Sequence, residues 1–335
     1  MPNTKLYKKL KHLGEGQYAN VYLAENQKTG LKVAIKKLKL GSRHEAQNGI
    51  NHTALAELKF LKRFCSHPNI IKLLDVYGNQ STISLVFEYI LTDLEKIISD
   101  QYLILSSADM KCLILQMMHG IAYLHSIWIL HRDLKPDNLL ISSKGVLKLA
   151  DFGLARYYGK EYYTMTCQVV TRWYRPPELL FGAVKYSDSV DIWSCGCIIA
   201  EILQKAPLFP GETDLGQLSC IFELLGSPNQ RNWQNTQLLP DYIQFNPAKH
   251  DVSNLVEVLS NLFSGASKNL LVLIASMIEL NPFRRISAVD ALKSNYFTEI
   301  PKPSEPSDLP LNTSESKKSS NFDISSSDVK KKLFN

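Results

Sequence analysis

The sequence predicts an α+β protein with two lobes, a small β-rich lobe followed by a larger, mostly helical one. Up to about residue 90 the chain alternates in short β-like runs such as YANVYLAE, KVAIKKLK and ISLVFEY, with one helical interruption at GINHTALAELKFLKRF. From about residue 92 long helical patterns dominate, namely SSADMKCLILQMMHGIAYLHSIW, SVDIWSCGCIIAEIL and NLLVLIASMIEL. The chain after Pro301 is rich in Pro, Ser and Lys. These changes divide it into an N-terminal lobe (1–90), a C-terminal lobe (91–300) and a tail (301–335) that we expect to be disordered.

The composition narrows the class of protein before any motif does. At 335 residues, 45% hydrophobic and 21% charged, the chain is long enough to bury a large core. A net charge of +6 does not indicate a dedicated polyanion binder, and an anionic ligand such as a nucleotide fits equally well. The absence of a signal sequence and of a bilayer-length apolar run predicts a soluble, intracellular protein with no membrane partner. A direct nucleic-acid partner is not expected either. The six cysteines have no zinc-like spacing, so we expect reduced, mostly buried thiols.

The densest polar run, HRDLKPDN at residues 131–138, lies between a predicted helix and a predicted hairpin at ISSKGVLKLA. It combines Asp133, Lys135 and Asn138, and a second carboxylate, Asp151, follows in ADFG. Two oxygen ligands and a free carboxylate suit Mg²⁺ binding and proton acceptance at a phosphoryl-transfer centre, because that chemistry needs charge neutralisation and positioning. A solvated polar loop is the other interpretation. The H-R-D-x-x-x-x-N spacing favours the catalytic one.

A glycine-containing segment, LGEGQYANV, joins two of the predicted strands. Gly14 and Gly16 allow a close approach of the backbone to phosphates, but Ala19 replaces the third glycine of G-x-G-x-x-G, and a plain hairpin turn explains the segment as well. Lys36 in VAIK strengthens the phosphate interpretation. Glu57 lies on the apolar stripe of the predicted helix and needs a cation, for which Lys36 is the natural candidate. The alternative is a solvated glutamate at the helix edge.

In order and at the expected separations, GEGQYANV, VAIK, Glu57, HRDLKPDN, DFG and RWYRPPE make residues 1 to about 300 resemble a eukaryotic protein kinase. WYR before PPE, and the segment after SVDIWSCGCIIAEIL, are similar to the branch that contains cyclin-dependent kinases. CQVVTRWYR, the terminal KKL with a Phe, and KKLKLGSRHEAQNGINHTALAEL in place of PSTAIRE resemble the CDK-activating kinases. The resemblance implies the bilobal protein kinase fold and transfer of the ATP γ-phosphate, with Mg²⁺, to Ser/Thr-Pro sites.

The same resemblance implies a role for each matching residue. Asp133 is expected to act as the base that orients the substrate hydroxyl, and Lys135 to steady the transferred phosphoryl group. Asn138 and Asp151 are the implied Mg²⁺ ligands, and Lys36 with Glu57 completes the catalytic set. The implied ATP site, with Phe87 at the back of the adenine pocket and the backbone of Glu88 and Ile90 at its edge, comprises Leu13, Gly14, Glu15, Gly16, Gln17, Tyr18, Ala19, Asn20, Val21, Ala34, Lys36, Phe87, Glu88, Ile90, Asp93 and Leu140.

Regulation by phosphorylation is implied at Thr166, with Thr164 and Tyr18 as alternative positions. A phosphate carries nearly two negative charges and orders a loop through guanidinium groups, and Arg132 and Arg156 are the implied clamp.

The helix before Glu57 departs from the family at Ala56, where cyclin-dependent kinases usually carry a third clamping arginine. We therefore expect phosphorylation to be a modest enhancer, with strong dependence on a cyclin and an assembly subunit. The alternative is that Lys59 or a partner residue supplies the missing charge.

Three further residues have implied roles near the end of the activation segment. Arg175 is expected to shape the site for a proline after the phosphoacceptor, and Glu178 to pair with Arg285 in a structural contact. The Pro176-Pro177-Glu178 run replaces A-P-E, which proline tolerates in a tight extended turn.

The implied partners are a cyclin similar to cyclin H, a RING-type assembly subunit and transcription factor IIH. The implied protein substrates are other cyclin-dependent kinases and the RNA polymerase II C-terminal domain, and the implied location is the nucleus and the cytoplasm. Lysines near 317 and 330–332 suit a nuclear address or a merely solubilising tail. Two alternatives stay open: a direct cell-cycle or other transcriptional cyclin-dependent kinase, and a pseudokinase scaffold without phosphoryl transfer.

Overall fold

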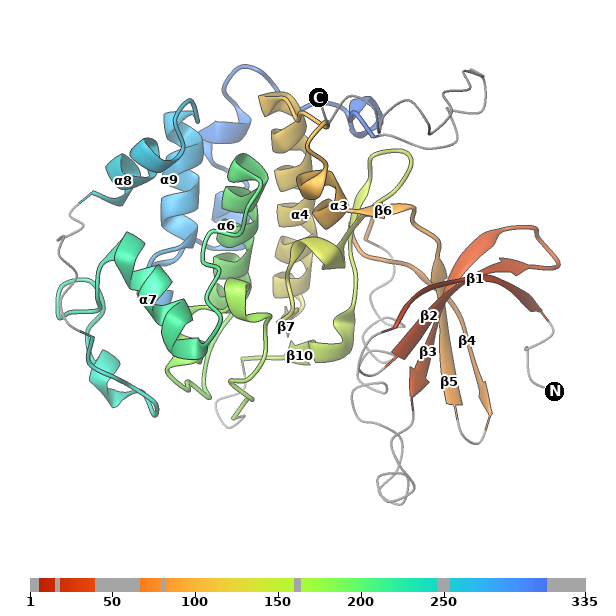
Figure 1. Ribbon diagram of the computed structural model, residues 1–335, viewed down its shortest axis with the longest axis horizontal. Helices are drawn as coiled ribbons and strands as arrows, with labels where there is room; N and C mark the ends of the chain where they lie inside the picture. The colour runs from red at the N-terminus through yellow and green to blue at the C-terminus, as the bar shows by residue number, and fades with distance from the viewer. Residues whose placement is uncertain are drawn as a thin grey trace, which may run out of the picture.

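The computed structural model describes residues 6–15, 19–39, 67–79, 82–159, 164–245 and 254–311. It has a β-sheet lobe on one side and a helical lobe on the other, as Figure 1 shows. This arrangement confirms the predicted α+β class. The predicted helix that carries Ala56 and Glu57 lies outside the described residues, as do Gly16, Gln17 and Tyr18.

The smaller lobe is a five-stranded antiparallel sheet with the strand order β1-β2-β3-β5-β4. Its strands are β1 (Tyr7–Glu15), β2 (Ala19–Asn26), β3 (Lys32–Lys39), β4 (Leu73–Asn79) and β5 (Thr82–Glu88). Because alternate side chains of a strand point to opposite faces, Val33 and Ile35 bury one face of β3 while Lys36 points to the other. The sheet therefore presents Lys36 on the side opposite its small apolar cluster.

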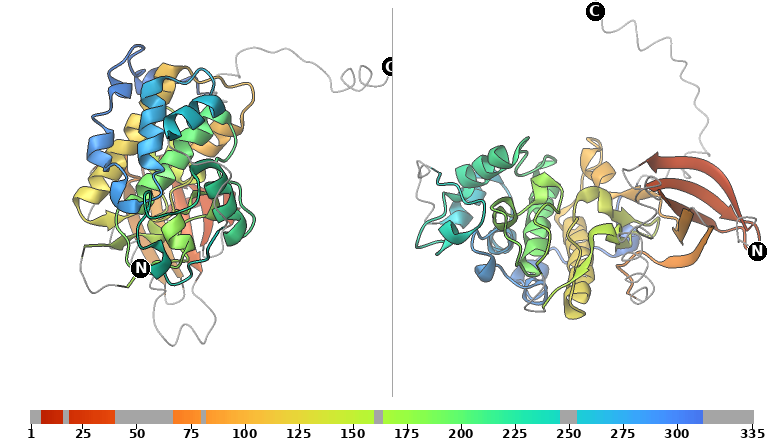
Figure 2. Two further views of the ribbon diagram at one scale, coloured as in Figure 1. Left: turned by 90° about the vertical axis from the view of Figure 1, so that its left-hand side faces the viewer. Right: turned by 90° about the horizontal axis from the view of Figure 1, so that it is seen from below.

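The larger lobe is helical and is organised around two long central helices. Its helices are α3 (Leu94–Ser99), α4 (Ser107–Ser126), α5 (Pro177–Leu180), α6 (Ser189–Gln204), α7 (Asp214–Leu225), α8 (Leu255–Leu262), α9 (Lys268–Met277) and α10 (Ala288–Ala291). Ser106 and Asp109 begin α4 with reciprocal side-chain to backbone bonds, which satisfy two otherwise unpaired N–H groups. Helix α6 is apolar almost all round and is buried between α4 and α9 (Figure 2).

Short strands join the helical lobe to the chemistry-bearing loops. Strands β6 (Thr92–Asp93), β8 (Leu139–Ile141) and β9 (Leu147–Leu149) form one small sheet, and β7 (Ile129–Leu130) pairs with β10 (Arg156–Tyr157). The β8–β9 pair confirms the predicted hairpin. The polar run 131–138 thus connects β7 to β8, and Asp151 follows β9 closely, so both are fixed by paired backbone on each side.

Cysteine environments follow from this packing. In the described ranges Cys112, Cys195 and Cys197 are buried free thiols, and Cys167 and Cys220 are partly exposed free thiols. Burial raises the pKa of the Cys195 thiol well above its ordinary value, so this thiol stays protonated and unreactive at neutral pH.

None of the helices in the described ranges has the length and apolar character that crossing a bilayer requires.

Residues 301–311 correct the predicted start of the tail, because they are ordered against the helical lobe. The Ser304 amide donates to the Ala108 carbonyl at 3.0 Å, and its hydroxyl donates to Asp109 at 2.7 Å. Buried Lys111 on α4 donates to the Pro301 carbonyl at 2.7 Å, and Leu309 is buried. Composition misled here because a few specific anchors on α4 offset the ordering entropy that a Pro- and Ser-rich segment requires.

These contacts predict that truncation at Lys302 destabilises the helical lobe. A chain that ends at Lys302 should melt several degrees below the full chain, because burial of a leucine such as Leu309 contributes about 1.5–3 kcal/mol. A chain that ends at Leu311 is the control and should melt like the full chain. Differential scanning calorimetry of the three proteins checks this, and equal midpoints for all three would show that segment 303–311 adds no stability.

Candidate active site

The buried imidazole of His131 organises the polar loop. Its Nε2 donates to the Ala150 carbonyl at 3.0 Å, and its Nδ1 accepts from the Asp133 amide at 3.3 Å. Ala150 directly precedes Asp151. One ring therefore fixes the spacing between the backbones that carry the two predicted catalytic carboxylates.

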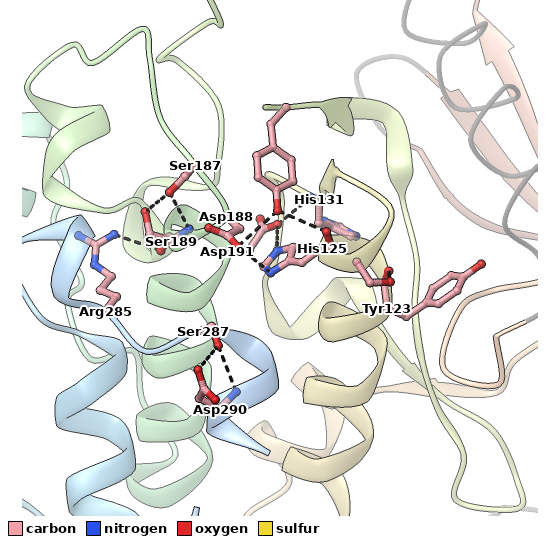
Figure 3. A network of polar contacts seen from close by, with 12 residues as sticks. Tyr123, His125, His131, Ser187, Asp188, Ser189, Asp191, Arg285, Ser287 and Asp290 are labelled. Atoms are coloured by element: carbon pink, nitrogen blue, oxygen red, sulfur yellow. Dashed lines mark hydrogen bonds and ion pairs between the residues drawn. The ribbon is translucent and has the colours of Figure 1, made fainter. Parts of the chain in front are cut away.

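A second anchor comes from α6, where the buried Asp191 carboxylate accepts three bonds. The His131 and Arg132 amides donate to it at 2.9 Å each, and His125 Nε2 bonds to it at 3.0 Å (Figure 3). Burial tends to raise the pKa of Asp191, but the His125 bond and the backbone N–H bond lower the pKa by more than burial raises it. The carboxylate therefore stays ionised. Arg132 has φ +66°, a conformation these bonds hold in place.

Sequence reasoning missed Asp191 as a site residue. The available signal was a carboxylate inside the otherwise apolar run SVDIWSCGCIIAEIL, because a charge on a buried helix requires partners.

Asp133, the predicted base, has both carboxylate oxygens oriented by neighbours. Asn138 Nδ2 donates to Asp133 Oδ2 at 3.1 Å and to its carbonyl at 2.7 Å, and the Thr171 hydroxyl donates to Oδ1 at 3.2 Å. Lys135 is partly buried directly before the 3-10 turn Pro136–Asn138. The loop thus brings Asp133 and Asn138 together, as predicted, and Thr171 is an additional contact from the activation segment.

Lys36 reaches across from β3 to the second carboxylate. Its Nζ lies 2.8 Å from Asp151 Oδ1, and the Gly153 amide donates to the same oxygen at 3.3 Å. Burial tends to raise the pKa of Asp151, but the Lys36 ammonium and the Gly153 N–H lower it more. Asp151 is therefore an anion at neutral pH. Glu57, the predicted partner of Lys36, lies outside the described residues.

The described members of the predicted ATP site lie on strands of the sheet lobe and in the connection between the two lobes. Gly14 pairs with Val21 and Glu15 with Asn20 at the β1–β2 turn, and a β-bulge adjoins Gly14. On β3 Ala34 lies opposite Phe87, which is buried in β5. The other members are placed near these strands or at the link: Leu13 on β1, Ala19 on β2, Ile90 after β5, and Leu140 on β8 opposite Asp93.

Two acidic side chains of that set are already engaged. The Glu88 carboxylate accepts from the Lys72 amide and from Lys148 Nζ, each at 2.8 Å. Asp93 begins α3, accepting from the Lys96 amide at 2.9 Å and pairing with the Lys96 ammonium. The Glu88 carboxylate is therefore occupied within the protein, its backbone contact with adenine stays a prediction, and the Asp93 carboxylate is occupied at the start of α3.

The predicted phosphate clamp shows clustered positive charge. Arg132 Nη1 donates to the Tyr186 hydroxyl at 2.7 Å, and that hydroxyl donates to the Thr166 carbonyl at 2.7 Å. Burial, with the nearby Arg132, lowers the pKa of Arg156. The side chains of Thr166 and Thr164 are both exposed. Tyr186 was not predicted, and it ties the Thr166 backbone to the clamp.

The predicted Glu178–Arg285 pair is present and buried. Nη1 lies 2.6 Å from Oε1 and Nη2 lies 2.7 Å from Oε2, a bidentate arrangement. Arg285 also donates to the Ser189 carbonyl at 3.1 Å, the contact that Figure 3 draws from α6. Pro177 occupies the first position of α5, where its missing N–H costs nothing, so the Pro-Pro-Glu departure is accommodated.

Arg175 holds two carbonyls of the segment before it. Its Nε donates to the Val169 carbonyl at 2.9 Å, and its Nη2 donates to the Val170 carbonyl at 3.0 Å. Val170 has φ +67°, which is strained for a β-branched residue. The guanidinium therefore holds a backbone conformation that valine alone would not adopt.

Together these groups provide an oriented carboxylate, a second ionised carboxylate bound to a lysine, and an amide side chain that bonds to the first carboxylate. Positioning of this kind suits transfer of a phosphoryl group, where electrostatic stabilisation and alignment supply most of the catalysis.

Comparison with known proteins agrees with this geometry. Residues 7–297 match the family model described as protein kinase domain. Cyclin-dependent kinase 7 of Xenopus laevis is 50% identical, covering 91% of this chain and 85% of that protein. Cyclin-dependent kinase 7 of Caenorhabditis elegans is 48% identical, covering 92% of each.

Solved structures point the same way. A chain in the structure of the CAK complex from Chaetomium thermophilum bound to ATP-gamma-S superposes with a TM-score of 0.84 and 38% identity, covering 92% of this chain and 95% of that one. The chain therefore belongs to the protein kinase family, among the cyclin-dependent kinases related to cyclin-dependent kinase 7.

Proposed function

We propose that this cyclin-dependent Ser/Thr kinase, which binds ATP and a cyclin, phosphorylates Ser/Thr-Pro sites in the activation loops of other cyclin-dependent kinases and in the RNA polymerase II C-terminal domain. The observation that carries its chemistry is the Asp133 carboxylate, held by Asn138 beside the Lys36–Asp151 pair. Its assignment to CDK-activating kinase is supported by the relatives named cyclin-dependent kinase 7 and by the CAK complex neighbour.

In the proposed reaction Asp133 orients the substrate hydroxyl and accepts its proton, because its carboxylate is fixed by Asn138 and Thr171. Lys36 holds the α and β phosphates of ATP, and Lys135 steadies the transferred group. Neither lysine forms a covalent bond with the phosphoryl group, so both act by position and charge.

Asn138 and Asp151 would hold Mg²⁺. They supply the amide and carboxylate oxygens that this ion prefers, and the Asn138 Nδ2 bonds to Asp133 leave its amide oxygen for a metal. Two protein ligands suffice because Mg²⁺ takes its remaining ligands from phosphates and water. Bound Mg²⁺ would neutralise charge on the β- and γ-phosphates.

Selection of proline after the phosphoacceptor follows from Arg175. Its bonds occupy the Val169 and Val170 carbonyls. A substrate N–H that approaches them therefore gives up its hydrogen bond to water and finds no carbonyl to replace it. Proline has no amide N–H to leave unpaired. A Ser/Thr-Pro site is therefore bound at a lower desolvation cost than any other.

The proposed partners are a cyclin similar to cyclin H, a RING-type assembly subunit and transcription factor IIH, with the nucleus as the main location and the cytoplasm as a second. The similarity to a chain of the CAK complex supports a multi-subunit assembly. Ala56 adds to this, because a chain with one fewer clamping arginine depends more on partners to place its regulatory helix.

A kinase assay with the co-purified complex tests the proposal. Phosphate transfer to a polymerase-tail peptide and to an inactive cyclin-dependent kinase is expected, with the largest stimulation by a cyclin H-type partner across a panel of cyclins. Stimulation by a cell-cycle cyclin alone would favour the direct cell-cycle kinase, and absence of any ATP turnover would favour the pseudokinase.

Thr166→Ala is expected to lower the activity of the complete complex by less than about a hundredfold. A single charge-assisted bond contributes ~1.5–3 kcal/mol, and two clamp arginines hold the phosphate less firmly than three. Activity is measured at saturating cyclin and assembly subunit, with Thr164→Ala as the matched control. A larger loss would contradict the modest role of Thr166, and Ala56→Arg should make the wild type more responsive to phosphorylation.

A further inference from the structure

The first turn of α7 packs against the 3-10 turn Arg172–Tyr174 and its neighbour Arg175. Asp214 Oδ1 accepts from Arg172 Nε at 2.8 Å and lies 3.3 Å from Arg175 Nη1. Arg172 Nη1 donates to the Glu212 carbonyl at 2.9 Å, and Gln217 Nε2 donates to the Trp173 carbonyl at 3.3 Å. One carboxylate thus joins Arg172 and Arg175, and the Gln217 side chain of α7 and the Glu212 carbonyl before α7 contact the same turn.

Arg175 needs that carboxylate more than Arg172 does. The Arg175 side chain is 14% exposed and that of Arg172 is 41% exposed. Burial lowers the pKa of the Arg175 guanidinium, Asp214 opposes this effect, and the neighbouring Arg172 adds to it. Without Asp214, two cations would face each other with one of them largely removed from water, which favours rotation of Arg175 toward solvent.

The guanidinium of Arg175 is planar, so fixing one of its nitrogens fixes the direction of the others. Asp214 engages Nη1, while Nε and Nη2 hold the Val169 and Val170 carbonyls. The strained φ of +67° at Val170 costs on the order of 1–3 kcal/mol and persists only where its surroundings enforce it. Rotation of Arg175 would release both carbonyls to the substrate.

We propose that Asp214 is a positioning residue for substrate selection, which orients Arg175 and so keeps the Val169 and Val170 carbonyls occupied. A substrate amide N–H then finds no acceptor there, whereas proline has no N–H that needs one. This role rests on the proline preference proposed above. Asp214 acts through Arg175 and does not touch the reacting atoms. It lies in the first turn of α7, where the helix dipole favours a negative charge.

The experiment compares kcat/KM for two synthetic peptides that differ only in Thr-Pro against Thr-Ala, using the kinase with its cyclin. Asp214→Ala is expected to lower the Thr-Pro to Thr-Ala ratio by about five- to tenfold, the size for losing one partly exposed charge-assisted bond, with the KM for ATP unchanged. Asp214→Glu should recover most of the ratio, which a purely structural loss would not. Glu212→Ala is the matched control and should keep the wild-type ratio, because Glu212 contributes its backbone carbonyl.

The outcomes separate this inference from the proposed function. A high wild-type ratio that Asp214→Ala leaves within about twofold overturns the role of Asp214 alone. A wild-type ratio near one removes the proline preference itself and, with it, the role of Asp214. Equal loss of activity on both peptides, with the ratio kept, also overturns the inference, because it assigns Asp214 to folding rather than to selection.

Discussion

Asp133→Asn should slow phosphoryl transfer by a factor of about 10² or more at saturating ATP and peptide, the range for losing positioned acid-base help. The amide of asparagine fits the same space and can still accept from Asn138, so the loop should keep its shape. It cannot take up the hydroxyl proton. The expected change is therefore in kcat rather than in the KM for ATP, measured by steady-state kinetics with purified kinase and cyclin.

Asp137→Asn is the matched control for that variant, because Asp137 is an exposed aspartate in the same loop. It should retain a near wild-type rate and melting temperature. Transfer by Asp133→Asn at the wild-type rate would remove Asp133 from its role as base. A fall in both variants would instead indicate sensitivity of the whole loop to lost negative charge.

The catalytic loop was predictable from sequence because its residues are close together in the chain. HRDLKPDN places Asp133, Lys135 and Asn138 on one short connection, and the structure finds Asn138 Nδ2 on the Asp133 carboxylate. The strand carrying Lys36 was equally clear, since alternation along KVAIKKLK sets which face it points to. Local patterns therefore determined the elements and most of the candidate site.

The supports of the site were not predictable, because they come from far along the chain. Asp191 contacts the amides of His131 and Arg132 across about sixty residues of sequence, and Tyr186 contacts Arg132 across a similar separation. Pattern reasoning marks such residues as buried or polar but not as partners. The ordered segment 301–311 was missed for the same reason, since its anchors Asp109 and Lys111 belong to a distant helix.

Breaking the Glu178–Arg285 pair should have the largest effect on stability. Removing one partner of a buried, bidentate pair leaves an uncompensated charge and typically costs about 3–5 kcal/mol. Arg285→Ala also deletes the bonds to the Glu279, Leu280 and Ser189 carbonyls. We expect its urea midpoint to fall accordingly, with activity lost in parallel because Glu178 closes the activation segment.

Arg284→Ala is the matched control, since Arg284 is the exposed neighbour of Arg285 and should change the free energy of unfolding by less than about 0.5 kcal/mol. The double variant Glu178→Leu/Arg285→Leu discriminates further. It removes both charges together, so no buried charge is left unpaired, and it should be more stable than Arg285→Ala. If Arg285→Ala unfolds at the same urea concentration as Arg284→Ala, the pair contributes no stability, and its conformational role in the activation segment would have to be measured by activity alone.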